Sequence, residues 1–159
     1  MKLEKTTAQR LSSAEKQLTV LISKLEPSTQ KILKSLRKGL KKRFPSLNEL
    51  VYDYGKSVVI SWSPNERGAD GVVALSADGE GVRLVFTHGV SLPDPNKILL
   101  GKATQIRYIR PESAKDLLRP EVEALMSAAV KKAGAMLSAT GRGELIIKDL
   151  GKKKGGIKK

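Results

Sequence analysis

The middle of the chain is a series of short apolar runs separated by turn-forming residues. These runs are rich in β-branched and aromatic residues, which favour strands, and they span Leu50–Tyr54, Ser57–Trp62, Val72–Ala77 and Val82–Phe86. The connections at 65–71 and 77–81 contain glycine, which permits tight turns between neighbouring strands. We therefore expect four consecutive strands that pair antiparallel.

Helical periodicity flanks these strands on both sides. Apolar residues recur every three or four positions after Ser12, after Pro27 and after Pro120, which predicts three helices. The pattern from Ser12 to Glu15 is typical of a capping box, so the first helix is expected to open there. A further alternating run at 105–110 predicts a fifth strand.

Length and composition are consistent with one folded unit. A chain of 159 residues, 40% of them hydrophobic, is long enough to bury a single core. We expect an α+β fold of two layers, in which helices cover an antiparallel sheet of about five strands, over residues 12–150. Residues 1–11 are expected to form a flexible N-terminus. Residues 151–159 are expected to form a disordered basic tail, because they bury too little apolar surface to offset the entropy of ordering.

Several functional classes are excluded by composition. The chain has no cysteine, which excludes disulfides, a thiolate nucleophile and Cys-ligated zinc, and its single histidine excludes a cage of several histidines within one chain. We expect no cofactor and no metal site. There is no apolar run of membrane-spanning length and no secretory signal, so we expect a cytoplasmic protein that does not enter a membrane.

The net charge of +14 is concentrated at the two ends of the chain. Residues 1–45 carry +9 and residues 141–159 carry +5, whereas residues 46–140 sum to zero. One face of the second helix and the tail therefore supply candidate contacts to nucleic acid or another polyanion, which are Lys34, Arg37, Lys38, Lys41, Lys42, Lys152, Lys153 and Lys154. Only 4% of residues are aromatic and no nucleic-acid-binding motif is present, so such association would be nonspecific. The alternative is a solvated helix face with a solubilising tail.

The segment from Phe86 to Arg110 carries the other group of candidate residues. A small pocket could use polar groups of His88 and Asp94 and attract an anion through Lys102 and Arg107. The alternative is structural, since the prolines on either side of Asp94 rigidify the chain and an aspartate commonly satisfies nearby backbone N–H groups. We assign no catalytic residue, because a lone histidine is a weak signal for a general base.

This segment also resembles a family. His88-Gly89, the stretch from Leu92 to Pro95, and a Gln-x-Arg pattern ending in Ile109-Arg110 are similar to the YdhG-like domains, a largely uncharacterised bacterial family. The resemblance covers roughly residues 25–148 and implies a two-layer α+β fold with kinship to secretion chaperones. It implies no established reaction. Many members have Gly-x-Gly-Lys where this chain has the residues 101–104, so the resemblance carries no phosphate cradle to this chain.

Some members of that family are labelled iron chaperones, which would require a site for a hard cation. Such a site needs converging oxygen ligands, and the acidic residues of this chain are sparse and scattered. Iron delivery is therefore only a minor alternative. Taken together, the sequence favours a binding or interaction module over an enzyme, with anion binding or catalysis at the His88, Asp94 and Arg107 loop as the main alternative.

Overall fold

The computed structural model describes residues 7–134 and 143–148, with side chains from Ser13 onward. Within these residues the α-helices are α1 (Thr7–Ser23), α2 (Pro27–Arg43) and α3 (Pro120–Ala133). The strands are β1 (Asn48–Asp53), β2 (Val58–Ser63), β3 (Val73–Asp78), β4 (Gly81–Phe86), β5 (Arg107–Ile109) and β6 (Leu145–Ile147). Short 3-10 helices are η1 (Gly68–Asp70), η2 (Gly89–Ser91) and η3 (Ala114–Leu118).

The strands form one sheet in the order β5-β4-β3-β2-β1-β6. The strands β1 to β5 pair antiparallel with their neighbours, as their tight connections predict. The sixth strand, which is not among the five expected, consists of the short apolar run Leu145–Ile147 and adds parallel to β1. The expected α+β class is confirmed, with one more strand than the five expected.

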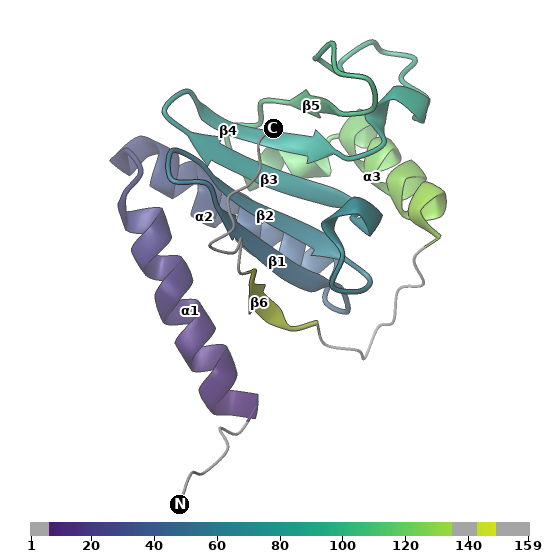
Figure 1. Cartoon of the computed structure of the whole chain (residues 1–159). Helices are drawn as coiled ribbons and strands as arrows, with labels where there is room; N and C mark the ends of the chain where they lie inside the picture. The colour runs from purple at the N-terminus through teal and green to yellow at the C-terminus, as the bar shows by residue number, and fades with distance from the viewer. Residues whose placement is uncertain (1–6, 135–142, 149–159) are drawn as a thin grey trace, which may run out of the picture.

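One face of the sheet carries the core. Val51, Ile60, Leu75 and Leu84 are neighbours across β1 to β4, and all four are fully buried. Figure 1 shows α2 and α3 behind the sheet in this view, with α1 along the side nearest β6. The buried stripe of α2 consists of Thr29, Leu33, Leu36 and Leu40, at the spacing of three and four that places residues on one helix face. No helix in the described residues is both long and apolar enough to cross a membrane.

The first helix begins earlier than its sequence pattern predicts. α1 starts at Thr7, so Ser12 lies inside the helix and the predicted capping box is wrong. The residues 7–11, which were expected to belong to a flexible N-terminus, lie in α1, while 1–6 are outside the described residues. The Glu15 carboxylate binds Arg37 of α2 instead of a backbone donor of its own helix.

Arg37 is the centre of a partly buried ion-pair network. Its Nε lies 2.7 Å from Glu49 Oε2 and its Nη2 lies 3.0 Å from Glu49 Oε1. The same guanidinium donates to both carboxylate oxygens of Glu15, at 3.0 and 3.3 Å. The Arg37 and Glu49 side chains are only 15% and 7% exposed. Each charge therefore has little water to solvate it and depends on its partner.

A second arginine links the other side of α2 to α3. Arg43 donates two hydrogen bonds to the Glu123 carboxylate of α3, at 3.0 and 2.7 Å, and its guanidinium lies 4.8 Å from the ring centre of Phe44. The two arginines thus join α2 to its neighbours on opposite flanks. Arg37 holds α1 and β1, and Arg43 holds α3.

Arg37→Met should lower the free energy of unfolding by about 3 kcal/mol, because it leaves the Glu49 carboxylate buried without a partner. Lys34→Met, at an exposed position of the same helix, is the matched control and should change it by less than about 0.5 kcal/mol. Urea denaturation of the whole chain measures both. Equal midpoints for the two variants would show that the network does not hold the fold.

The acid sensitivity of the fold should depend on Glu15 and Glu123. Hydrogen bonds from Arg37 and Arg43, respectively, hold the pKa of each carboxyl below its ordinary value of 4.5. The charged forms therefore favour the folded state. Their contribution is fully present above the unfolded pKa and is lost as the pH falls through the lower folded pKa.

The double variant Glu15→Gln, Glu123→Gln should consequently lose less stability than the unmodified chain between about pH 6 and about pH 3. Thermal unfolding across this range provides the measurement. Curves that decline in parallel would contradict the assignment of these two carboxyls as acid-sensitive links.

Candidate functional site

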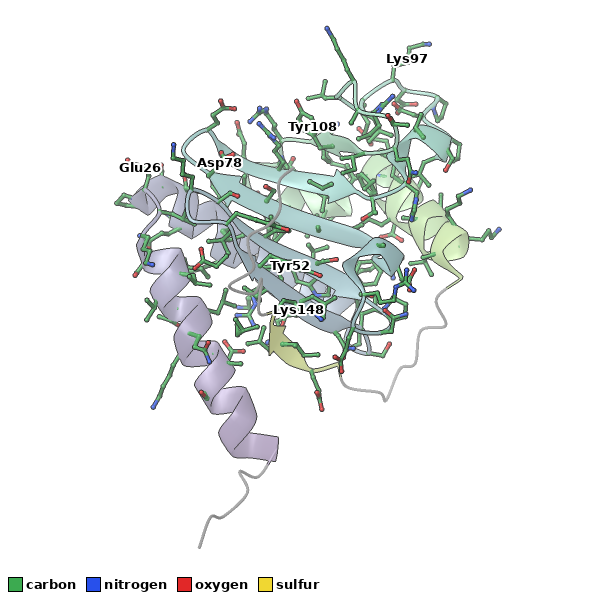
Figure 2. The ribbon with its side chains drawn as sticks, in the orientation of Figure 1. Glu26, Tyr52, Asp78, Lys97, Tyr108 and Lys148 are labelled. Atoms are coloured by element: carbon green, nitrogen blue, oxygen red, sulfur yellow. The ribbon has the colours of Figure 1, made fainter. Side chains whose placement is uncertain are left out.

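The connection between β4 and β5 is held against the edge of the sheet. Near its C-terminal end, Leu100 of this connection pairs with Tyr108 of β5 through an antiparallel bridge. A Cβ atom on Gly89 would lie 2.5 Å from the Cβ of Arg107, so the close approach of η2 to β5 requires glycine there. Figure 2 shows Lys97 at the outer tip of this connection and Tyr108 on β5, the edge strand of the sheet. The candidate residues of this segment thus lie in or beside an ordered loop that packs on the edge of the sheet.

Asp94 is used by the backbone of its own loop. Its two carboxylate oxygens accept hydrogen bonds from the backbone N–H groups of Ile98 and Leu99, at 3.0 and 2.9 Å. Its carbonyl accepts from the N–H of Lys97, which has a φ of 55°. The carboxylate therefore stabilises a tight turn, as the structural alternative predicts.

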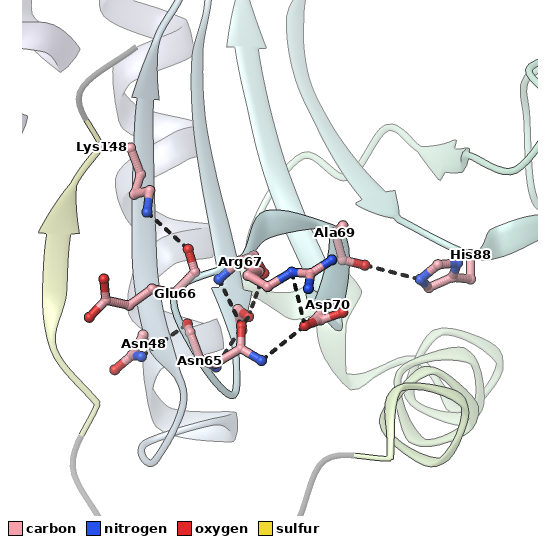
Figure 3. Close-up of polar contacts among 9 residues, drawn as sticks. Asn48, Asn65, Glu66, Arg67, Ala69, Asp70, His88 and Lys148 are labelled. Atoms are coloured by element: carbon pink, nitrogen blue, oxygen red, sulfur yellow. Dashed lines mark hydrogen bonds and ion pairs between the residues drawn. The ribbon is translucent and has the colours of Figure 1, made fainter. Parts of the chain in front are cut away.

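His88 connects this loop to another part of the sheet. Its Nδ1 lies 3.1 Å from Gln105 Oε1, and its Nε2 lies 3.2 Å from the carbonyl oxygen of Ala69 in η1. Figure 3 shows the imidazole reaching the connection between β2 and β3, where Asn65, Arg67 and Asp70 form a hydrogen-bonded cluster. Both ring nitrogens thus have partners within the protein.

The two cations of the loop differ in their surroundings. The guanidinium of Arg107 donates from Nη1 to the carbonyl oxygens of Ala103 and Ile106, at 2.5 and 2.7 Å, which turns it back onto its own loop. Lys102 is exposed to solvent. A hollow of about 290 Å³ lies beside Asp94, between the proline-rich turn and α3, and its lining includes none of His88, Lys102 and Arg107. The structure does not gather the four residues around that hollow.

The basic residues of α2 form a more open surface. Five lysines are exposed on the side of the helix opposite the buried leucines, and we call this surface the lysine face: Lys31, Lys34, Lys38, Lys41 and Lys42. Their spacings of three and four residues place them in a contiguous band. Lys41 is the one lysine of this band with a described ion pair, at 3.9 Å from Glu15 Oε2. The band therefore presents several cations to solvent.

Arg37 does not share this availability. It was expected to contact a polyanion together with the lysines, but its donors are bound to Glu15 and Glu49. The tail lysines Lys152, Lys153 and Lys154 lie outside the described residues. Lys34, Lys38, Lys41 and Lys42 thus remain from the expected set as exposed residues in the described part of the chain.

A groove next to the lysine face was not anticipated from the sequence. It has a volume of about 560 Å³ and lies between α2, η3 and α3, with Gly39, Leu117, Leu118 and Met126 among its lining residues. The one sequence signal is the pair Leu117-Leu118, because a short helical turn seldom buries two adjacent leucines on the same side. In the structure Leu117 is buried and Leu118 is 80% exposed.

In the described residues, no group of three or more His, Asp and Glu side chains is placed to hold a metal ion. Comparisons of the chain with protein-family models, with curated proteins and with solved structures find no match. The resemblance to YdhG-like domains therefore stays a prediction.

Asp94→Ala should lower the free energy of unfolding by about 1 to 2 kcal/mol, because two backbone N–H groups lose their acceptor. Lys102→Ala, in the same loop but exposed, should change it by less than about 0.5 kcal/mol. Urea denaturation of both variants tests the difference. An Asp94→Ala protein as stable as the unmodified chain would contradict the structural role of this carboxylate.

Proposed function

We propose that this protein is a cytoplasmic binding module rather than an enzyme, and that its lysine face associates with polyanions such as nucleic acid. One observation carries the proposal. On α2 the two arginines are bound to carboxylates, whereas the lysines of the opposite side are exposed. The positive charge of the helix is therefore divided between arginines that hold the fold and solvent-exposed lysines, of which only Lys41 has an ion pair in the described residues.

The dimensions of the lysine face suit a polyanion. From Lys31 to Lys42 the helix rises about 16 Å at 1.5 Å per residue, a length along which a nucleic acid presents several phosphates. Lysine ammonium groups bind phosphates as point charges and read no base sequence. The association would therefore be nonspecific and would weaken steeply with salt.

The loop between β4 and β5 offers weaker support for a site. Asp94 is occupied by backbone N–H groups, and Arg107 donates to carbonyls of its own loop, so an incoming anion would have to displace these contacts. The proposed function includes the tail lysines Lys152 to Lys154 as secondary contacts, since their charge has the same sign.

Replacing Lys31, Lys34, Lys38 and Lys42 together by glutamine should weaken binding to a fluorescent DNA duplex more than tenfold at about 50 mM salt. The slope of log K against log salt should become shallower by about three to four, because each lost phosphate contact removes about 0.9. Fluorescence anisotropy across a salt series measures both quantities.

The matched control replaces Lys24, Lys56, Lys131 and Lys132, which are also exposed, and removes the same charge from other surfaces. It should reduce affinity much less. An equal loss in both proteins would mean that net charge alone drives binding, and no complex with the unmodified chain at low salt would reject the proposed function. The DNA affinity of a protein lacking residues 151–159 measures how much the tail lysines contribute to binding.

A further inference from the structure

The groove between α2, η3 and α3 has an apolar interior. Gly39, Ala114, Leu117 and Met126 contribute to its wall, and Leu118 stands at its border with 80% of its surface exposed. Exposure of a large aliphatic side chain to water is unfavourable. A partner that covers this side chain together with the apolar hollow would therefore gain free energy from burial. The groove is therefore shaped to receive an apolar group.

The exposure of Leu118 arises from a well-anchored turn. Ser113 caps η3 by accepting a hydrogen bond from the N–H of Lys115, and the N–H of Ala114 donates to Ser35 Oγ of α2 at 3.1 Å. The neighbouring Leu117 is buried against Gly39, where a Cβ atom would lie only 2.8 Å from Leu117 Cδ1. Because Leu117 and these hydrogen bonds hold η3 in place, Leu118 is directed outward by the geometry of the turn.

The border of the groove is positively charged. Lys38, Lys42 and Lys115 line it and are exposed, and none of them makes an ion pair within the described residues. The groove also includes Arg43 and Glu123, but these two neutralise each other. Three ammonium groups with no ion pair in the described part of the chain thus border an apolar interior, and a complementary partner would carry carboxylates around an apolar side chain.

We propose that the groove binds an acidic amphipathic segment of another protein, with a leucine-like or phenylalanine-like side chain in the hollow and carboxylates at Lys38, Lys42 and Lys115. This inference rests on the proposed function in one respect, since it shares Lys38 and Lys42 with the lysine face, and it adds a protein partner at the adjoining groove. A nucleic acid backbone has no aliphatic group to cover Leu118. A second copy of this chain, at +14, and its own Lys-rich C-terminal sequence both carry the charge of the border and do not complement it.

Two fluorescein-labelled peptides of about 16 residues, roughly four helical turns, test the inference on the full chain. Both are rich in glutamate, one has leucine every three or four residues, and the other has serine at those positions. The leucine peptide should bind at least tenfold more tightly than the serine peptide in fluorescence anisotropy. Leu118→Gln and the pair Lys38→Gln, Lys42→Gln should each weaken the leucine peptide at least tenfold, whereas Lys24→Gln, Lys56→Gln should not.

Amide chemical shifts provide a second readout. The leucine peptide should shift the signals of Gly39, Leu117 and Met126, which line the groove. Equal affinity for the two peptides, no binding of either, or an unchanged affinity in Leu118→Gln would overturn the inference. Binding of the DNA duplex, measured on the same proteins, tests the proposed function separately. If the chain binds DNA but does not distinguish the two peptides, the proposed function is supported and the groove inference is rejected.

Discussion

The guanidinium of Arg37 joins three elements of the structure, α1, α2 and β1, through one partly buried group. It binds Glu15 of α1 and Glu49 of β1 from its position on α2, and the backbone N–H of Glu49 in turn donates to the carbonyl of Glu144, where the chain enters β6. Breaking it would strand a buried carboxylate, which costs far more than an exposed pair. The placement of α1 and of the β1 edge of the sheet therefore depends on a side chain whose sequence context resembles that of the neighbouring lysines.

This constraint explains how one basic helix serves two purposes. Arginine suits the flanks of α2, because its planar fork donates to two carboxylates at once, as Arg37 does, while lysine remains solvated and free on the outer side. The surface left open is the lysine face together with the adjoining groove at Leu118. Charge and apolar surface thus occur side by side at the junction of α2 and η3, and this junction is the basis of both proposals.

The helices α2 and α3 were predictable because each has a helical hydrophobic period and begins at a proline, Pro27 or Pro120. The strands β1 to β4 were predictable as β-branched and aromatic runs between turn residues, and β5 lies within a longer alternating run at 105–110. The start of α1 was not predictable. Ser12 and Glu15 form a capping pattern in the sequence, but the helix begins at Thr7 and the Glu15 carboxylate binds Arg37 of α2. β6 was seen only as an apolar run, since three residues carry no period and their partner in β1 is remote in sequence. For Asp94 the sequence offered both a site and a turn, and the two backbone hydrogen bonds favour the turn.

Composition and periodicity alone determined the α+β class, the basic character of α2 and the absence of any cysteine chemistry, because these depend on which residues occur and on their local spacing. Which cations are free and where apolar surface remains uncovered were decided by the tertiary structure. Arg37 and Lys38 are adjacent in the chain, yet one lies between two carboxylates and the other borders a groove. The residues that separate them, Glu49 and Leu117, belong to other elements, β1 and η3, and no pattern within α2 encodes these contacts.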